Sequence, residues 1–381
     1  MTMTKKLIIR NLNIVCNRGI EVLASDRAIE AGFVQREIPV GLIPKELDSE
    51  MSLWSRNHSQ LKRTDRMVKM SAWLASKLDN SELAGRKVLV NLGSSRGGTQ
   101  LTEDLHQQFL ETGSVPIIAS PLTTQANMSS VVASVLDAES IITIDHSLTC
   151  STGIASVANA IAWLRSGMAD VVVCGAAEAA VTPFTIAQIE ALGIASRYKV
   201  DEFPCRPFNV ENENTFVLSE GAGICVILID FPKAGDLVIE SIGFAHQLPP
   251  SATGIAEDGG PLLTSMREAV ENLPVNRKVD LVLAHAPGTV KGDRAESNAI
   301  NSVLGSQVSV YSPKWLTGHT YAASSMLNLK LAAELFSGAI PPKLPYESYL
   351  KANLVEPKTI LINATGFGGN AMSLVVSGDV F

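Results

Sequence analysis

The sequence predicts an α/β protein made of two similar halves, each a layered arrangement of strands and helices. Short runs of β-branched residues alternate with stretches of helical spacing along almost the whole chain. Hydrophobic residues make up 46% of the 381 residues and aromatic residues only 5%, so Ala, Val, Ile and Leu must form most of the core. A chain of this length favours two domains or one large two-lobed unit.

The first half of the chain contains four apolar runs that predict strands. These runs lie at residues 6–15, 87–92, 141–150 and 170–174, and helical spacing at 65–78, 101–110 and 151–167 predicts the helices between them. Three other segments predict irregular structure: the polar stretch 24–61, the GSSRGG turn at 93–98 and the SPLTTQAN loop at 120–127. The turn is not a phosphate loop, because no Lys-Ser/Thr pair follows its glycines.

The second half repeats this alternation after a polar loop at 202–214. Paired strands are predicted at 223–230 and 237–244, on either side of the FPKAG turn. This turn places a domain boundary near Phe231, so we expect domains at 1–232 and 233–381. The remaining predicted elements are helices at 262–272, 294–304 and 321–337, and strands at 279–285, 308–311, 359–364 and 372–377.

Charge and cysteine usage exclude several classes of protein. The formal charge of −7 argues against a nucleic-acid-binding surface. The five cysteines form no CxxC pair and no metal-ligand spacing, so neither a disulfide scaffold nor a zinc site is expected. The N-terminal apolar run is broken by Arg10 and Asn11, which predicts a first strand and not a signal peptide. No run of 18 apolar residues occurs, and we expect a cytoplasmic protein that does not insert into membranes.

The candidate nucleophile is Cys150, which lies where a strand meets a helix. Ser151, Thr152 and Gly153 follow it and open an Ala-rich helical pattern. The free amides and the dipole of a helix N-terminus favour negative charge, so the pKa of this thiol is predicted to be lowered. A small cysteine buried in a core strand is an equally good interpretation of this stretch alone.

Two histidines stand at the ends of predicted elements, where catalytic groups of α/β folds gather. His285 lies where the strand 279–285 passes into a Gly- and Pro-containing loop, and His319 follows Gly318 just before a helix. His146, inside the strand of Cys150, has a packing role by its position. A thiol near two imidazoles is typical of covalent acyl transfer.

These residues belong to a pattern that resembles the β-ketoacyl-acyl-carrier-protein synthases (ketosynthases of the KAS I/II type) of the thiolase superfamily. The resemblance covers about residues 60–378 and rests on six motifs in the family's order. They are TCSTG at Cys150 with DVVVCGAAEA after it, CRPFN at 205–209, SEGAG at 219–223, His285 with Gly292-Asp293, Lys314 with Gly318-His319, and NATGFGGN at 363–370. The family implies a thiolase-like duplicated architecture of five α-β-α-β-α layers.

The resemblance also implies a role for each catalytic residue. Cys150 takes an acyl group from a carrier-protein thioester. His285 and His319 assist decarboxylation of a malonyl unit and stabilise the enolate oxygen, while Lys314 holds and polarises this network. Glu296 matches the family glutamate that pairs with the lysine.

The resemblance also implies which residues stabilise the oxyanion of the reaction and which contact the pantetheine arm of the substrate. The amides of Cys150 and Phe367 form the oxyanion hole, and Phe367 is the gating phenylalanine, followed by the turn glycines Gly368 and Gly369. Thr289 lines the pantetheine tunnel, and Gly368 and Gly369 are expected to bind the substrate as well. No cofactor is expected, because 4′-phosphopantetheine arrives on the acyl carrier protein.

The sequence departs from the family at several positions that bear on the substrate. Pro287 replaces the first of two tunnel threonines, Asn370 stands where a threonine is usual, and Thr215 stands where a glycine is usual. These changes leave the chemistry intact and indicate an unusual acyl substrate. The SPLTTQANMSS segment resembles small ketosynthases of bacterial pigment pathways of the aryl-polyene or flexirubin type.

The family also implies partners. Acyl carrier proteins are acidic, so the basic cluster Lys62, Arg63, Arg66 and Lys69 is a candidate docking surface, with an ordinary solvated surface as the alternative. Ketosynthases form homodimers, or heterodimers with a related subunit.

Three other functions fit this sequence less well than a condensing enzyme does. A chain-length-factor-like partner subunit, which is catalytically silent, generally lacks the nucleophilic cysteine that Cys150 supplies. A thiolase needs a second cysteine near its C-terminus, whereas the last cysteine here is Cys225. A pure binding module leaves the cysteine, histidines and lysine unexplained.

Overall fold

A ten-stranded sheet runs through the computed structural model, which describes residues 4–23, 31–34, 38–124, 127–248, 251, 258–351 and 356–378. Its strands are β1 (Lys6–Cys16), β4 (Lys87–Gly93), β5 (Ser140–His146), β6 (Val171–Glu178), β8 (Gly221–Asp230), β9 (Leu237–His246), β10 (Leu281–Leu283), β11 (Ser309–Tyr311), β12 (Thr359–Thr365) and β13 (Asn370–Ser377). Strands β2 (Ala31–Val34), β3 (Ile38–Gly41) and β7 (Leu218–Ser219) form a second, small sheet.

The two halves of the large sheet have the same topology. The first half has the order β1-β8-β6-β4-β5 and the second the order β9-β13-β12-β10-β11. In each half the first two pairings are antiparallel and the last two are parallel. The prediction of a doubled α/β unit is therefore confirmed. The chain passes from one half to the other between Asp230 and Leu237, and a division into domains at residue 232 stays a prediction.

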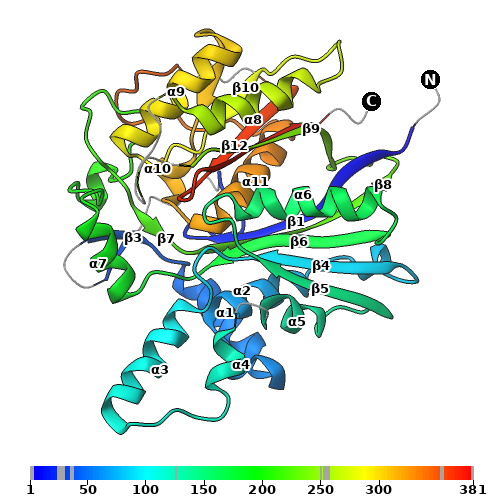
Figure 1. The fold of residues 1–381 in the computed structure, drawn as a ribbon, viewed down its shortest axis with the longest axis vertical. Helices are drawn as coiled ribbons and strands as arrows, with labels where there is room; N and C mark the ends of the chain where they lie inside the picture. Colours follow the sequence, from blue (N-terminus) through cyan, green and yellow to red (C-terminus); the bar gives the residue numbers. More distant parts are fainter. Residues whose placement is uncertain are drawn as a thin grey trace.

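Helices cover both faces of each half. The longer ones are α1 (Lys45–Arg56), α2 (Arg66–Ala75), α3 (Thr99–Thr112), α6 (Thr152–Arg165), α7 (Pro183–Ala191), α8 (Gly260–Glu271), α9 (Val290–Leu304) and α11 (Ser324–Phe336). The short ones are α4 (Ala119–Thr123), α5 (Asn127–Ala133) and α10 (Lys314–Thr317). Figure 1 shows α6 and α11 in the middle, α1, α2 and α5 on one side and α8 and α9 on the other.

The middle helices make this a layered structure. Helix α6 contacts β4 and β6 of the first half and also β13 of the second, and α11 contacts β12, β1 and α6. Small residues such as Ala155 and Ala332 let the helices approach the sheets closely, and both are buried in the largest apolar cluster. Separate apolar clusters lie under α2 and under α8 and α9. The α-β-α-β-α arrangement expected from the resemblance is confirmed.

Three local predictions are wrong. The strands at 223–230 and 237–244 are not paired with each other, because β1 lies between β8 and β9 and pairs with both. Residues 24–61 are not an irregular excursion throughout, since β2, β3 and α1 lie there, while 24–30 and 35–37 fall outside the described residues. The segment 120–127 contains the end of α4 and the start of α5, with 125–126 outside the described residues.

The sheet positions the candidate site. In the second half β10 and β12 are neighbouring parallel strands, so the loops after them leave the same edge of the sheet, where α/β proteins place their ligands. Among the described residues, no helix is both long and apolar enough to cross a bilayer.

Candidate active site

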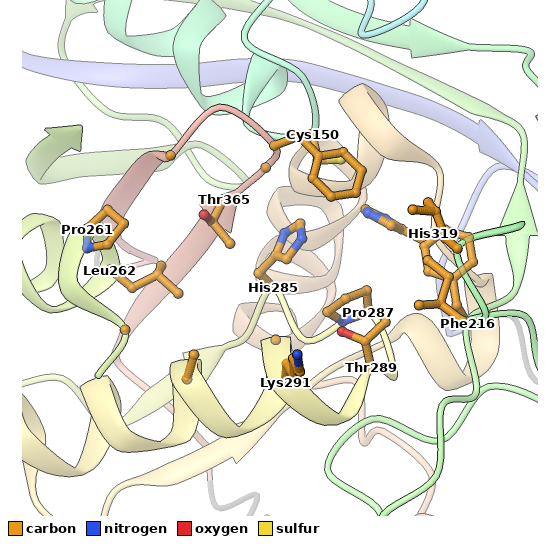
Figure 2. A pocket seen from close by; sticks show the side chains of 18 of the residues that line it. Cys150, Phe216, Pro261, Leu262, His285, Pro287, Thr289, Lys291, His319 and Thr365 are labelled. Carbon is orange, nitrogen blue, oxygen red and sulfur yellow. The ribbon is translucent and has the colours of Figure 1, made fainter. Parts of the chain in front are cut away.

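One cavity of about 430 Å³ brings together Cys150, His285, His319 and Phe367, residues that the sequence spreads over more than half of the chain. Its wall is mostly apolar. Figure 2 shows the rings of His285 and His319 below Cys150, with Thr365 and Leu262 to one side and Phe216 to the other. Within the described ranges, no group of three histidine, cysteine or acidic side chains is placed to hold a metal ion.

Cys150 lies in a turn and not at the end of a strand. Strand β5 already ends at His146, and Ser151 is the N-cap residue of α6. The Thr152 hydroxyl closes the turn, because its oxygen accepts from the Leu148 amide at 2.9 Å and donates to the Thr149 carbonyl at 2.6 Å. The prediction that the strand extends to residue 150 is wrong, because residues 148–152 form these turn hydrogen bonds instead of hydrogen bonds to a neighbouring strand.

Gly366 lets the loop after β12 approach this turn. A Cβ atom at Gly366 would lie 2.1 Å from Thr149 Oγ1 and 2.8 Å from the Cys150 amide nitrogen, closer than real Cβ contacts allow. Thr149 Oγ1 also donates to the Phe367 carbonyl oxygen at 3.1 Å. The two chain segments that carry the candidate oxyanion-hole amides of Cys150 and Phe367 are therefore in direct contact.

Burial raises the pKa of the Cys150 thiol to about 12, and the charge of Glu178 acts in the same direction. Lys314 and the cysteine's own amide oppose this shift. The predicted lowering of this pKa is therefore wrong for the free protein. A helix N-terminus contributes about 0.3–1 kcal/mol, whereas burial of a charged group can shift a pKa by several units.

His285 lies two residues after β10, which ends at Leu283, and two buried side chains hold its backbone. The His285 amide donates to Glu296 Oε1 at 2.8 Å, and the His285 carbonyl accepts from Lys314 Nζ. Glu296 also accepts from the Ala286 amide at 2.6 Å and from Asn363 Nδ2 at 2.9 Å. Glu296 therefore binds the backbone amide of His285, and Lys314 binds its backbone carbonyl. The resemblance implied a direct ion pair between Glu296 and Lys314 instead.

The charges around His285 are strongly perturbed by burial. Burial lowers the pKa of Lys314 to about 8, although Glu296 raises it. Burial and the charge of Lys314 hold the pKa of His285 well below its usual range. The same causes, with His285 added, lower the pKa of His319. Both imidazoles are therefore neutral at neutral pH.

His319 is held by contacts of its backbone and of its ring. Its amide donates to the Val217 carbonyl at 2.7 Å, and its ring lies edge-on to His285 with 5.1 Å between ring centroids. Phe216 and Tyr321 place their rings 5.3 and 5.4 Å from that of His319. The ring nitrogen Nδ1 lies 2.8 Å from Ser324 Oγ. An imidazole held in this way has little freedom to rotate.

The other predicted substrate-binding residues lie around the mouth. Thr289 and Gly369 line the cavity, whereas Gly368 is not among its lining residues and places its carbonyl oxygen 3.1 Å from His246 Nε2. Phe367 is 45% exposed, so its ring stands between cavity and solvent. Gly368 and Gly369 have φ angles of 90° and 77°, which favour glycine.

The predicted docking cluster separates into two kinds of residue. Lys62 and Arg63 are exposed, and Lys69 is partly buried. Arg66 instead donates to both carboxylate oxygens of the buried Glu220, at 2.7 and 2.8 Å, and pairs with Asp48. Arg66 therefore has a structural role, and its charge is largely neutralised.

Three residues near the nucleophile were not identified from the sequence. Glu178 is fully buried and accepts from Ser94 Oγ and the Ser95 amide, each at 2.9 Å. Tyr321 lines the cavity with a φ of 44°, an unusual backbone conformation for a tyrosine. Lys291 is exposed at the cavity rim and is the only lysine or arginine among the described lining residues.

Comparisons with known proteins identify relatives of this fold and site. The chain is 28% identical over 330 residues to 3-oxoacyl-[acyl-carrier-protein] synthase 2 of Vibrio cholerae, covering 79% of this chain and 78% of that protein. The structure of the ishigamide ketosynthase/chain length factor matches with a TM-score of 0.82 at 20% identity, over 98% of this chain and 99% of that one. A type II polyketide synthase acyl-carrier protein in complex with its ketosynthase (AntDE:AntF) matches with a TM-score of 0.77 at 21% identity, over 98% and 99%.

Family models match both halves of the chain. The β-ketoacyl synthase N-terminal domain matches residues 25–230, and the β-ketoacyl synthase C-terminal domain matches residues 237–347. Together these matches contain Cys150, Lys314 and both cavity histidines. A thiol that shares a cavity with two neutral imidazoles is what acyl transfer requires. Sequence, fold and site agree, and the chain belongs to the β-ketoacyl synthase family of acyltransferases.

Proposed function

We propose that this protein takes an acyl group onto Cys150 and lengthens it by decarboxylative Claisen condensation with a malonyl unit carried by an acyl carrier protein. The observation that carries the proposal is the single cavity in which the Cys150 thiol meets His285 and His319. The two imidazoles are neutral, which suits hydrogen bonding to an enolate. Fatty acid or polyketide synthesis is the setting of such a reaction.

The first step is transfer of the acyl group. The Cys150 sulfur attacks the thioester carbonyl, the new C–S bond forms, and the bond to the carrier's thiol breaks. Because burial raises the pKa of Cys150 to about 12, the thiol stays protonated until attack, and its proton ends on the departing carrier thiol. The amides of Cys150 and Phe367 stabilise the oxyanion. One such donor contributes about 3–4 kcal/mol.

The second step is condensation. The malonyl carboxylate leaves as carbon dioxide, and its bonding electrons form an enolate whose oxygen accepts from His285 and His319. The enolate carbon attacks the acyl group, and the C–S bond to Cys150 breaks. One proton from solvent restores the thiol. Lys314 and Glu296 hold the backbone of His285 during this step.

The carrier supplies its own prosthetic group in this scheme, so the protein needs no cofactor. The 4′-phosphopantetheine arm enters past Phe367 and Thr289 at the cavity mouth. The exposed cations Lys62 and Arg63 attract the acidic carrier, and the acyl-carrier-protein complex of a related fold supports this partner. We also propose a cytoplasmic location, because all five cysteines are free and buried, as suits a reducing compartment.

The exposed edge of the sheet supports association with a second subunit. Strand β5 is the outermost strand of the first half, and its Ile142 is 44% exposed, whereas the apolar residues of β4 and β6 are buried. An exposed apolar edge strand has unpaired backbone groups and tends to associate with another chain. We propose that this partner is a second copy or a related ketosynthase-like subunit. The ketosynthase/chain length factor structure supports the second choice.

The alternative function is that of a chain-length-factor-like subunit without activity of its own. Such a subunit has no use for a nucleophile in a cavity with two histidines. Cys150, His285 and His319 are all present and line one cavity, which favours the condensing enzyme.

The test is detection of acyl-Cys150 by intact-protein mass spectrometry with a panel of acyl-loaded carrier proteins. The proposal expects one acyl adduct per chain in the wild type and none in Cys150→Ala. Absence of an adduct with every carrier, alone or with a candidate partner subunit, contradicts the proposal.

A second variant separates the two steps. His319→Ala should still acquire the acyl group on Cys150 but should no longer release carbon dioxide from a malonyl-loaded carrier. Equal loss of both steps would show that His319 does not have the assigned role.

A further inference from the structure

The hydroxyl of Ser324, which is not a lining residue of the cavity, contacts the imidazole of His319. Ser324 Oγ lies 2.8 Å from His319 Nδ1, and the two residues are 4% and 2% exposed. At this distance, and away from water, the contact is a full hydrogen bond whose direction decides which ring nitrogen carries the proton.

A second hydroxyl indicates the direction of this hydrogen bond. Thr320 Oγ1, which is fully buried, lies 3.3 Å from Ser324 Oγ. A serine hydroxyl has one hydrogen and two lone pairs, so it can accept from Thr320 while it donates to His319. If Thr320 donates to Ser324 and Ser324 donates to His319 Nδ1, both hydroxyl hydrogens have an acceptor. If the donors run in the opposite direction, the buried hydroxyl hydrogen of Thr320 needs another acceptor.

We propose that Ser324 is a positioning residue that donates to His319 Nδ1 and thereby keeps the proton of the neutral ring on Nε2. Since Nδ1 is occupied by the hydrogen bond with Ser324, Nε2 is the nitrogen of this cavity-lining ring that is left for a reactant. An N–H at this position donates to a developing enolate oxygen. The inference deepens the proposed function and rests on it for the identity of that oxygen.

The neighbouring Ser325 offers a matched control. It follows Ser324 in the same first turn of α11 and is 1% exposed. Its Oγ is buried and, within the described residues, has no hydrogen-bond partner. Removal of the Ser325 hydroxyl deletes the same atoms from the same helix without touching His319.

The kinetic test compares Ser324→Ala, Ser324→Thr and Ser325→Ala with the wild type in two reactions. These reactions are acylation of Cys150 and release of carbon dioxide from a malonyl-loaded carrier. Ser324→Ala should lower decarboxylation about tenfold, the value of one hydrogen bond, and leave acylation within about twofold. Ser324→Thr retains the hydroxyl and should recover most of the rate, and Ser325→Ala should match the wild type.

A spectroscopic test does not depend on activity. In protein labelled with 15N-histidine, the six histidines give few enough signals for His319→Ala to assign the one of interest. The wild type should show the Nε2–H tautomer at His319, and Ser324→Ala should show a mixture of tautomers. If Ser324→Ala does not fold, Thr320→Val weakens the same hydrogen-bonded chain and should shift the tautomer ratio in the same direction.

The outcomes are distinct. An Nδ1–H tautomer in the wild type, an unchanged tautomer in the variant, or equal effects of Ser324→Ala and Ser325→Ala would overturn the inference. Equal loss of acylation and decarboxylation in Ser324→Ala would also overturn it, because that pattern indicates a general structural role. Lack of all acylation by the wild type contradicts the proposed function, while the tautomer measurement still decides the role of Ser324.

Discussion

Replacement of Gly366 by alanine should separate the two segments that form the oxyanion site. The added Cβ would lie 2.1 Å from Thr149 Oγ1 and 2.8 Å from the Cys150 amide nitrogen. Both distances are well below ordinary van der Waals contact, so one of the two segments must move. Gly366 does not have a left-handed φ, so the substitution is tested for its steric effect and not for backbone strain.

The magnitude follows from the donor that is lost. If the shift removes either amide from the oxyanion, the barrier rises by about 3–4 kcal/mol, and acylation of Cys150 slows about 100- to 1000-fold. Overpacking of this kind also costs about 1–3 kcal/mol of stability. The assay is the rate at which acyl-Cys150 forms in intact-protein mass spectra, together with the thermal midpoint of unfolding.

Gly368 supplies the control. It has a φ of 90°, and a Cβ placed there meets only Asn370 Nδ2, at 3.9 Å. Gly368→Ala therefore adds strain without a collision, at about 1–2 kcal/mol, and should acylate far faster than Gly366→Ala. Wild-type acylation by a folded Gly366→Ala variant would refute the reasoning, and so would equal slowing by both variants.

Three further predictions concern binding, pH and assembly. Lys62→Glu with Arg63→Glu should weaken carrier binding at low salt and much less at high salt, because both side chains are exposed; fluorescence anisotropy measures this. Burial lowers the pKa of Lys314 to about 8, so its ammonium is present below that pH and is lost above it. The decarboxylation rate should therefore fall as pH rises through about 8, and Lys314→Met should remove this step in the pH profile. Ile142→Lys places a charge on the exposed sheet edge and should shift the protein toward monomer in sedimentation velocity.

Each of these predictions has a contrary result. If neither the charge reversal nor the salt concentration changes the affinity for the carrier, Lys62 and Arg63 belong to an ordinary solvated surface and do not dock the carrier. Arg66→Glu is not an equivalent test, because it leaves the buried Glu220 without its ion pair and should destabilise the protein by about 3–5 kcal/mol. A pH profile without a step near 8 would refute the role of Lys314, and an unchanged sedimentation profile of Ile142→Lys would place the interface elsewhere.

Local sequence patterns predicted most strands because buried parallel strands are continuous apolar runs. They failed where structure depends on partners distant in sequence. Nothing in the stretch 223–244 reveals that β1 separates its two strands, since β1 pairs with them across more than 200 residues. Helix α1 was missed because its mostly polar face suggested a loop, although Met51 is buried in the core.

The candidate site was predictable in composition but not in its electrostatics. Cys150, His285, His319 and Phe367 were identified by motif, and one cavity unites them. The raised pKa of Cys150 depends on burial and on Glu178, which arrives from a different strand. Thr289 and Gly369 line the cavity and Gly368 does not, and substrate binding by these three residues stays a prediction. Ser324 stands in a run of small residues that the sequence shows only as a helix start.

The central place of β1 has a consequence for how this protein is made. This strand is synthesised before both of its neighbours, which lie some 200 residues further along the chain. At roughly 5–20 residues per second, β1 must wait roughly 10–40 s before β8 and β9 exist. During that time an apolar strand with two unpaired edges is exposed. Folding of the nascent chain therefore depends on protection of β1, and a shortened chain that ends before β8 has no partner strand for it.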